Sequence, residues 1–349
     1  MKQEPYWIGV DLHTRVIQVC VLDASSAIVH QDRRTGPTLE DGLELVQELA
    51  ERFPGAQLAV EALGTNRWFV AACEEHGLQV TVAHAGHLAL KSSGRKSDRR
   101  DAYELARRHR LGDIEKHAKA YHSTAEEYGW RQLFRQRHSL VARRTEIVCQ
   151  IRALLRSHRA ESPGGDLYAK RNLTKLRELK LQNEYEQLVF NSLVDLLIST
   201  HEIIQRLQKS CIELTKRQER MAPLLQLPYV GTVIAGTLVA ELGDVDRFRS
   251  AKAVASYAGL VPRVAQSAEQ ERGGPLVRHG NRELRFVLGE WAVQLLTKHP
   301  DARAWAQSRL ARMPKNKVRV TLARKLLVGV WHCLRTGEAF SLPRCLATA

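Results

Sequence analysis

Three short runs of mostly β-branched and aliphatic residues open the chain. They span Trp7 to Asp11, Val16 to Leu22 and Ala27 to His30, and polar or small residues separate them. Runs of this length and composition, interrupted in this way, are typical of β-strands. The start of the chain is therefore predicted to form two or three neighbouring strands.

A helical period replaces this pattern between Leu39 and Phe53. Apolar residues there recur at every third or fourth position until Pro54-Gly55, a pair that ends helices. Beyond it the pattern predicts a strand, a second helix and another strand, at residues 57–60, 66–76 and 78–82. This order of elements predicts an α/β sheet for the first part of the chain.

The rest of the chain is predicted to be mainly helical. From Arg131 to Arg159, two adjacent lines of apolar residues recur every seven positions, which predicts a long helix in a coiled coil or bundle. Ser162-Pro163-Gly164-Gly165 breaks this helix, and Leu181 to Leu214 forms another. The second long helix can pair with the first or with another protomer.

Charge is distributed unevenly along the 349 residues. The chain has 53 Lys and Arg against 38 Asp and Glu, so its formal net charge is +15. Residues 1–90 contain six basic and twelve acidic side chains, a net charge of −6, and the remainder therefore carries +21. A strongly basic remainder indicates a polyanionic partner.

Composition also excludes several classes of protein. No apolar run approaches the ~18–20 residues that span a bilayer, and the first residues lack the order of a signal peptide. The six cysteines are widely spaced with no CxxC pair, which argues against a disulfide framework or a zinc site. We expect a soluble, cytoplasmic protein with a polyanionic partner and no membrane partner.

The first long helix is the most basic part of the chain. Eight arginines lie between Arg131 and Arg159, against the single acid Glu146. Solvated helix faces usually mix charges of both signs, so this bias favours contact with phosphates. The nucleic-acid-binding candidates in this helix are Arg131, Arg135, Arg143, Arg144 and Arg152.

Four acids stand where the predicted elements can use them for chemistry. Asp11 lies in or at the end of the first strand, and Glu61 ends the strand after the first helix. Asp98 and Asp101 are three residues apart and share a face of the helix that follows. Carboxylates are the ligands that Mg²⁺ or Mn²⁺ prefers. Each acid alone is more often a helix cap or a surface residue, and Asp98 can simply cap its helix.

Ordered motifs give the chain a family resemblance. Gly9-Val10-Asp11, Val60-Glu61-Ala62-Leu63-Gly64 and Lys96-Ser97-Asp98-Arg99-Arg100-Asp101-Ala102 resemble the DEDD transposases of bacterial insertion sequences. That family includes the pilin-gene invertase Piv and the bridge-RNA-guided recombinases. The resemblance continues in Leu227-Pro228-Tyr229-Val230-Gly231, Phe248-Arg249-Ser250-Ala251, Tyr257-Ala258-Gly259-Leu260-Val261-Pro262 and His279-Gly280-Asn281.

This resemblance implies an α/β plus α fold in three parts. Residues 1–122 would form a RuvC-like, ribonuclease-H-type domain that binds metal, and residues 123–220 a long helical coiled-coil region. Residues 221–349 would form a mainly helical transposase domain. The implied ligands of Mg²⁺ (or Mn²⁺) are Asp11, Glu61, Asp98 and Asp101.

The resemblance also implies a nucleophile in a segment that the pattern alone leaves as a polar loop. In the family, a serine five residues after the proline of the Gly-Leu-Val-Pro motif takes DNA covalently, and Ser267 occupies that position. Here Ala268 follows, where the family usually has glycine. Cations around a phosphate would assist serine attack, and the candidates nearby include Arg263, Arg278 and Arg282.

The turn around Tyr229 has two interpretations. Residues 224–242 are predicted to form helix, tight turn and helix, which resembles a helix–hairpin–helix that offers backbone N–H groups to phosphate. The usual first glycine is replaced by Tyr229, so a hairpin that only packs against its neighbours is about equally favoured.

The leading hypothesis for function is a transposase or site-specific recombinase that cuts and rejoins DNA strands. The resemblance implies catalysis by divalent metal and a phosphoserine intermediate, with DNA as both target and donor. It implies homodimers that assemble into a homotetramer, and a structured guide (bridge) RNA that selects the sites by base pairing. The basic middle region suits the backbone of such an RNA.

Two alternatives remain open from the sequence. One is a Holliday-junction-resolvase-like nuclease in which metal-activated water cuts the strand and Ser267 is incidental. The other is a non-catalytic nucleic-acid-binding derivative of a transposase, with Ala268 as a mark of decay. An actin-like ATPase would need glycine-rich phosphate loops downstream of Gly9, and the later motifs do not supply them.

Overall fold

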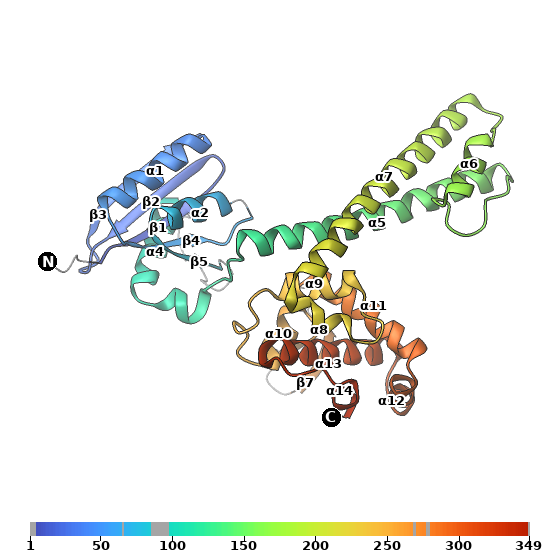
Figure 1. The fold of residues 1–349 in the computed structure, drawn as a ribbon. Helices are drawn as coiled ribbons and strands as arrows, with labels where there is room; N and C mark the ends of the chain where they lie inside the picture. Colours follow the sequence, from blue (N-terminus) through green and yellow to red (C-terminus); the bar gives the residue numbers. More distant parts are fainter. Residues whose placement is uncertain (1–4, 65, 85–97, 268–269, 277–279, 348–349) are drawn as a thin grey trace. The chain divides into compact units, whose positions relative to one another are not determined.

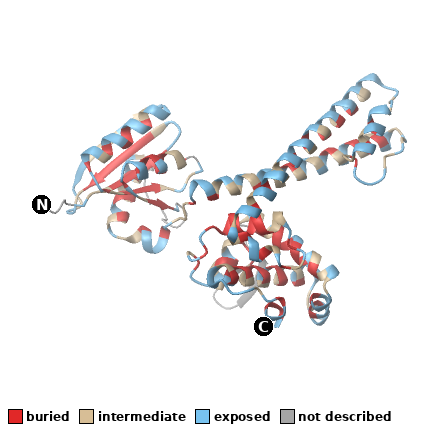
Figure 2. Ribbon diagram, in the orientation of Figure 1, coloured by how far each residue is buried: buried red, intermediate tan, exposed pale blue. Residues whose placement is uncertain are grey.

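The computed structural model describes residues 5–64, 66–84, 98–267, 270–276 and 280–347, and for residues 262–276 it describes the backbone path. The chain divides into two compact units, residues 1–122 and residues 123–349. Each unit has its own hydrophobic core (Figure 2). We describe each unit by itself.

The first unit is built on a mixed five-stranded sheet (Figure 1). Its spatial order is β3-β2-β1-β4-β5, with β2 antiparallel to both β1 and β3, and with β4 parallel to both β1 and β5. The predicted α/β sheet is confirmed. The strands are β1 (Trp7–Leu12), β2 (Val16–Leu22), β3 (Ile28–Thr35), β4 (Gln57–Glu61) and β5 (Gln79–Ala83).

Helices cover both faces of this sheet. On one face, α1 (Leu39–Arg52) and α2 (Arg67–Glu75) bury a core that includes Ile8, Val10 and Phe69. On the other face, α4 (Asp98–Arg110) packs on the sheet through small residues, followed by a π-helical turn (Ile114–Ala118). Because both faces are covered, β1 is buried along nearly its whole length.

Local capping explains where two of the predicted helices begin. Thr38 accepts a hydrogen bond from the Asp41 N–H, and the Asp41 carboxylate accepts one from the Thr38 N–H. Thr124 and Glu127 make the same reciprocal pair at the start of α5. Such capping boxes satisfy N–H groups that the first helical turn leaves without partners.

In the second unit, two long helices pack against each other: α5 (Ala125–Ser157) and α7 (Glu184–Arg217). Ile147 and Leu155 of the predicted apolar lines pack with Phe190 and Leu197 of α7. The pairing of the two long helices is therefore made within one chain. The short helix α6 (Lys170–Glu178) lies against α7.

The carboxyl-terminal helices form the largest core. Nearly every residue of α9 after its first turn is buried, and Trp291 and Leu327 lie fully buried among the helices. The helices are α8 (Ala222–Leu225), α9 (Thr232–Leu242), α10 (Ala251–Tyr257), α11 (Arg282–Lys298), α12 (Pro300–Leu310), α13 (Lys315–Thr336) and α14 (Leu342–Ala347), and a 3-10 turn (Glu219–Met221) precedes α8.

One β-hairpin interrupts these helices, where the pattern alone predicted a polar loop. Strands β6 (Pro262–Ser267) and β7 (Gln270–Leu276) pair antiparallel between α10 and α11. Polar and glycine-rich strands lack the apolar alternation by which a strand is recognised in sequence, which explains the difference. Among the helices of the described ranges, none is long and apolar enough to cross a membrane.

Candidate functional site

Strand alternation determines where Asp11 points. Ile8 and Val10 face the core under α1 and α2, so Gly9 and Asp11 face the opposite side of the sheet, which α4 covers. Asp11 is only 3% exposed. The carboxylate therefore lies between the sheet and α4 rather than in solvent.

Parallel pairing places Glu61 beside Asp11. Gly9 is opposite Ala59 and Val10 opposite Val60 in the β1–β4 register, so Asp11 and Glu61 follow at the ends of adjacent strands. Ala59 packs on the α4 side of the sheet, and Glu61, two residues further along, points to the same side. Glu61 is half-buried.

A glycine allows α4 to carry its two acids to this edge. A Cβ atom at Gly9 would lie 2.0 Å from the Ala102 carbonyl oxygen and 2.5 Å from the Ala106 nitrogen. No side chain fits there, so the backbone of α4 rests directly on β1. Asp98 and Asp101 occupy the first turn of α4, on the face that also carries Ala102. Both are half-buried.

The electrostatics of Asp11 show that the four acids lie near one another. The pKa of the Asp11 carboxyl is raised to about 6, mainly by burial; His13 lowers it, and the negative charges of Asp101, Asp98 and Glu61 add to the rise. The His13 Nε2 lies 3.1 Å from Oδ1 of Asp11. Burial of a carboxylate that also experiences the charge of other acids disfavours its ionised form, and such perturbed groups cluster at functional sites.

Sequence reasoning missed two residues at this edge. His13 pairs with Asp11, and the signal in the sequence is their i, i+2 spacing, which places both side chains on one side of an extended segment. Asn66 is 2% exposed, and its Nδ2 donates a 2.6 Å hydrogen bond to the Glu61 carbonyl oxygen. Asn66 thereby fixes the turn that follows Glu61.

The chemistry of these donors fits a divalent metal. Four carboxylates offer the hard oxygen ligands that Mg²⁺ and Mn²⁺ take, and a cation would stabilise the ionised Asp11, whose pKa is raised by burial and by the other acids. Within the residues that the structure describes, no three His, Cys, Asp or Glu side chains lie close enough together to hold a metal ion.

Ser267 is the last residue of β6 and pairs with Gln270 of β7. The side chains of Ser267 and Arg263 lie outside the described residues, as do Ala268 and Arg278 entirely. The hairpin root is well defined. Gly280 has φ +143°, and a Cβ there would lie 2.6 Å from the Gly259 Cα and 2.8 Å from the Arg285 Nη1. The two ends of the hairpin segment thus approach as only glycine permits, beside a guanidinium.

Tyr229 takes the glycine conformation of the turn before α9. Its φ is +63°, in the left-handed region that side chains rarely adopt. The turn is held by the Trp291 indole, whose Nε1 donates to the Pro228 carbonyl oxygen at 2.9 Å. Tyr229 therefore adopts a backbone conformation that glycine usually supplies in turns.

Most of the α5 arginines that the sequence suggested as nucleic-acid contacts instead have partners within the second unit. Arg131 donates to the Ala240 carbonyl oxygen, Arg135 pairs with Glu241, and Arg152 donates to the Gly165 carbonyl oxygen. Arg144 stacks over the Tyr168 ring at 3.8 Å. Arg143 in α5 and Arg282 in α11 are exposed, and they are the better candidates for contact with nucleic acid.

The strand order of the first unit, with carboxylates at the ends of two adjacent parallel strands, defines a RuvC-like, ribonuclease-H-type domain. Two solved structures are similar to part of the chain. The Thermus thermophilus RuvC structure covers 33% of this chain and 98% of its own, at 16% identity and a TM-score of 0.27. The large terminase nuclease of phage G20c covers 30% and 82%, at 16% identity and a TM-score of 0.26.

Two family models match the chain. Residues 8–159 match the transposase model of DEDD type named for IS110, and residues 221–307 match the transposase IS116/IS110/IS902 family. A probable family 20 transposase of Pseudomonas aeruginosa is 27% identical over 94% of this chain and 96% of its own. The transposase for insertion sequence element IS1111A of Coxiella burnetii is 25% identical over 95% and 90%.

The chain belongs to the IS110 family of insertion-sequence transposases. Both models describe transposases, and their matched ranges together cover more than half of the chain. Membership in this family makes it a DNA-cleaving and recombining enzyme.

Proposed function

We propose that this transposase cuts and rejoins DNA with divalent metal held by Asp11, Glu61, Asp98 and Asp101 and with Ser267 as the nucleophile. The observation that carries the metal part is the convergence of four carboxylates from β1, β4 and α4. The serine part rests on the family motif, whose serine position lies in the β6–β7 hairpin.

Bound divalent metal would neutralise negative charge on the scissile phosphate and on the departing oxygen. Asp11 contributes the most buried carboxylate, and His13 holds its Oδ1. The Ser267 oxygen attacks phosphorus and its proton leaves to a base. The bond from phosphorus to the leaving strand then breaks, and that strand's oxygen accepts a proton. Attack by the hydroxyl of an incoming strand reverses these steps and releases the serine.

Four variants test this mechanism on a supplied DNA site. Asp11→Asn should reduce metal-dependent cleavage by about 10³-fold, the scale of losing a group that acts on transition-state charge. Ser267→Ala should form no covalent protein–DNA adduct, whereas Ser308→Ala, on the helix α12, should form it normally. Asp113→Asn, an exposed acid beyond α4, controls for the charge change. Adduct formation by Ser267→Ala would sink the serine part.

Guide-RNA recognition and assembly from dimers into a tetramer belong to the same proposal. Residues 123–349 contain 37 basic and 21 acidic side chains, and this net charge of +16 and the exposed Arg143 support a polyanionic partner for the second unit. Purification from cells that carry the flanking DNA, followed by sequencing of bound RNA, should recover one defined transcript. The mass of the protein–RNA complex in solution should correspond to two or four protein chains plus the bound RNA. Recovery of random cellular RNA would contradict guidance.

A metal-dependent nuclease without a serine step is the second candidate. One observation favours it: all four carboxylates lie within residues 1–122, so the acidic site requires nothing from the rest of the chain. In this case Ser267→Ala cleaves as fast as the wild type, and the product carries no attached protein.

A further inference from the structure

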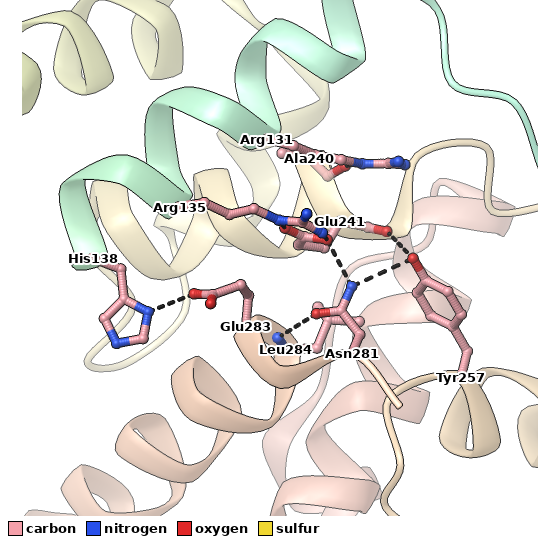
Figure 3. Close-up of polar contacts among 9 residues, drawn as sticks. All are labelled: Arg131, Arg135, His138, Ala240, Glu241, Tyr257, Asn281, Glu283 and Leu284. Carbon is pink, nitrogen blue, oxygen red and sulfur yellow. Dashed lines mark hydrogen bonds and ion pairs between the residues drawn. The ribbon is translucent and has the colours of Figure 1, made fainter. Parts of the chain in front are cut away.

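The second unit contains a buried carboxylate that the proposed chemistry does not use. Glu241, in the last turn of α9, is 1% exposed. Arg135 of α5 donates to it twice, from Nε to Oε1 at 2.6 Å and from Nη2 to Oε2 at 2.7 Å. Figure 3 shows this bidentate pair at the centre of a group of polar contacts. Two parallel charge-assisted bonds fix both side chains in orientation as well as in distance.

The same glutamate is bound by residues on both sides of the β6–β7 hairpin. Asn281, just after the hairpin, donates from Nδ2 to Oε2 of Glu241 at 2.6 Å. Tyr257, just before it, donates its hydroxyl to the Glu241 carbonyl oxygen at 3.1 Å. The two flanks are also joined directly, because the Asn281 N–H donates to the Tyr257 carbonyl oxygen at 2.8 Å.

The two polar atoms of the Asn281 side chain make different contacts. Its Oδ1 accepts from the Leu284 N–H and caps α11, while its Nδ2 serves Glu241. One amide thus starts the helix after the hairpin and ties that start to α9. A further contact joins α11 to α5, the helix that carries Arg135, since His138 of α5 pairs with Glu283 in the first turn of α11.

Burying a charge at this place needs a reason. Replacing a buried ion pair by packed apolar side chains is often neutral or stabilising, so the pair is not explained by stability alone. A satisfied polar network does fix geometry, since each member has one arrangement that pairs every donor. Here the geometry that is fixed is the root of the hairpin, where Gly259 and Gly280 are in close contact.

We propose that Glu241 is a positioning residue that holds the hairpin bearing Ser267 in register with α5, through Asn281 and Tyr257 on one side and Arg135 on the other. The role assigned to the serine rests on the proposed function; the clamp on the hairpin root does not. Glu241 acts on the reaction only through the placement of the strand that ends at Ser267.

The test uses Asn281→Ser, which keeps an oxygen to cap α11 and removes the donor to Glu241. Asn183→Ser is the matched control, because Asn183 caps α7 through the same side-chain oxygen and has no contact with Glu241. We expect Asn281→Ser to lower the rate of adduct formation at saturating DNA about tenfold, with unchanged DNA affinity. Asn183→Ser should leave both at the wild-type values.

Asn281→Asp sharpens the test, because it also keeps the cap but places a second carboxylate against Glu241. Like charges at this distance repel, so we expect a loss of about a hundredfold in the same rate. Tyr257→Phe, which removes one donor at the other flank, should resemble Asn281→Ser. Equal rates for Asn281→Ser and Asn183→Ser would overturn the proposal, and so would a loss of DNA affinity equal to the loss of rate.

Hydrogen exchange separates this proposal from the proposed function. If wild-type protein forms no adduct that depends on Ser267, the serine mechanism fails, yet the clamp remains measurable. Amides of residues 262–276 in the full chain should then exchange about tenfold faster in Asn281→Ser than in Asn183→Ser. Unchanged exchange would show that Glu241 does not hold the hairpin.

Discussion

Two buried carboxylates, Asp11 in the first unit and Glu241 in the second, have opposite surroundings. Asp11 is 3% exposed, and this burial and the negative charges of three further acids raise the pKa of its carboxyl. Its partner is one half-exposed histidine. Glu241 is 1% exposed and accepts from a guanidinium and an amide. The ionised Asp11 carboxylate therefore carries an electrostatic penalty that a cation would relieve, whereas the charge of Glu241 is already balanced within the chain.

Replacing each carboxylate by its isosteric amide tests this difference, because the two variants should change the free energy of unfolding in opposite directions. Glu241→Gln leaves the Arg135 guanidinium without its counter-charge, so we expect a loss of about 3 kcal/mol, low in the range for broken buried pairs because Arg135 is 44% exposed. Thermal or urea unfolding of the full chain measures it. Glu290→Gln, at an exposed pair with Arg319, should cost less than about 1 kcal/mol.

Asp11→Asn should act in the opposite direction and stabilise the protein without metal. The folded-state pKa of about 6 lies above the unfolded value of 3.8. Ionisation of this carboxyl therefore lowers the free energy of unfolding by at most about 3 kcal/mol. Loss of the His13 contact offsets part of this gain.

The pH dependence of that gain has a definite sign. Because the raised pKa favours the protonated folded state, the stabilising contribution of protonated Asp11 to the free energy of unfolding is present below pH 4 and is lost as the pH rises through 6. The melting-temperature advantage of Asp11→Asn in chelator should therefore grow from pH 4 to pH 7. Added Mg²⁺ should stabilise the wild type and leave Asp11→Asn unchanged. A destabilised variant at pH 7 would contradict the assignment.

Gly9→Ala should separate the acids without removing any. The new Cβ would collide with the Ala102 carbonyl, so α4 must shift from the sheet, at about 1–3 kcal/mol. Metal affinity, measured by calorimetry, should fall while all four carboxylates remain. Gly64→Ala is the control, since a Cβ there meets nothing within 4 Å; equal affinities for the two variants would rule out this role of Gly9.

The smallest effect is expected at the surface of α5. Arg143→Gln removes an exposed cation, so it should weaken nucleic-acid binding severalfold and lower the salt slope by about one, with no change in melting temperature. Arg135→Gln should instead lower the melting temperature, because that side chain pairs with buried Glu241. If Arg143→Gln leaves the salt slope unchanged, this face of α5 does not contact phosphates.

The first unit was largely predictable because its signals are local. Short runs of β-branched and aliphatic residues predicted the strands, the period of three to four predicted α1, and Pro54-Gly55 predicted where α1 ends. The placement of Asp11 at a strand end followed from the same pattern. That the acids meet across Gly9 was not predictable from pattern, since a glycine in a strand does not say which helix will rest on it.

The second unit was predicted in its long helices and missed in its polar contacts. The seven-residue lines predicted α5, and the apolar positions of residues 181–214 predicted α7, whereas the hairpin of Ser267 has no apolar alternation. The arginines of α5 look alike in sequence. Arg135 and Arg143 differ only in what lies opposite, and for Arg135 that is a glutamate 106 residues away in the chain.

The sequence by itself determined the strands and helices of the sheet, the basic second unit and the ordered motifs of an insertion-sequence transposase, because each depends on residues near one another in the chain or on counts. Only the tertiary structure decided which charges meet. It surrounded Asp11 with acids and gave Glu241 an arginine and an asparagine. Electrostatic energies depend on separation and burial in space, and neither can be read from position along a chain.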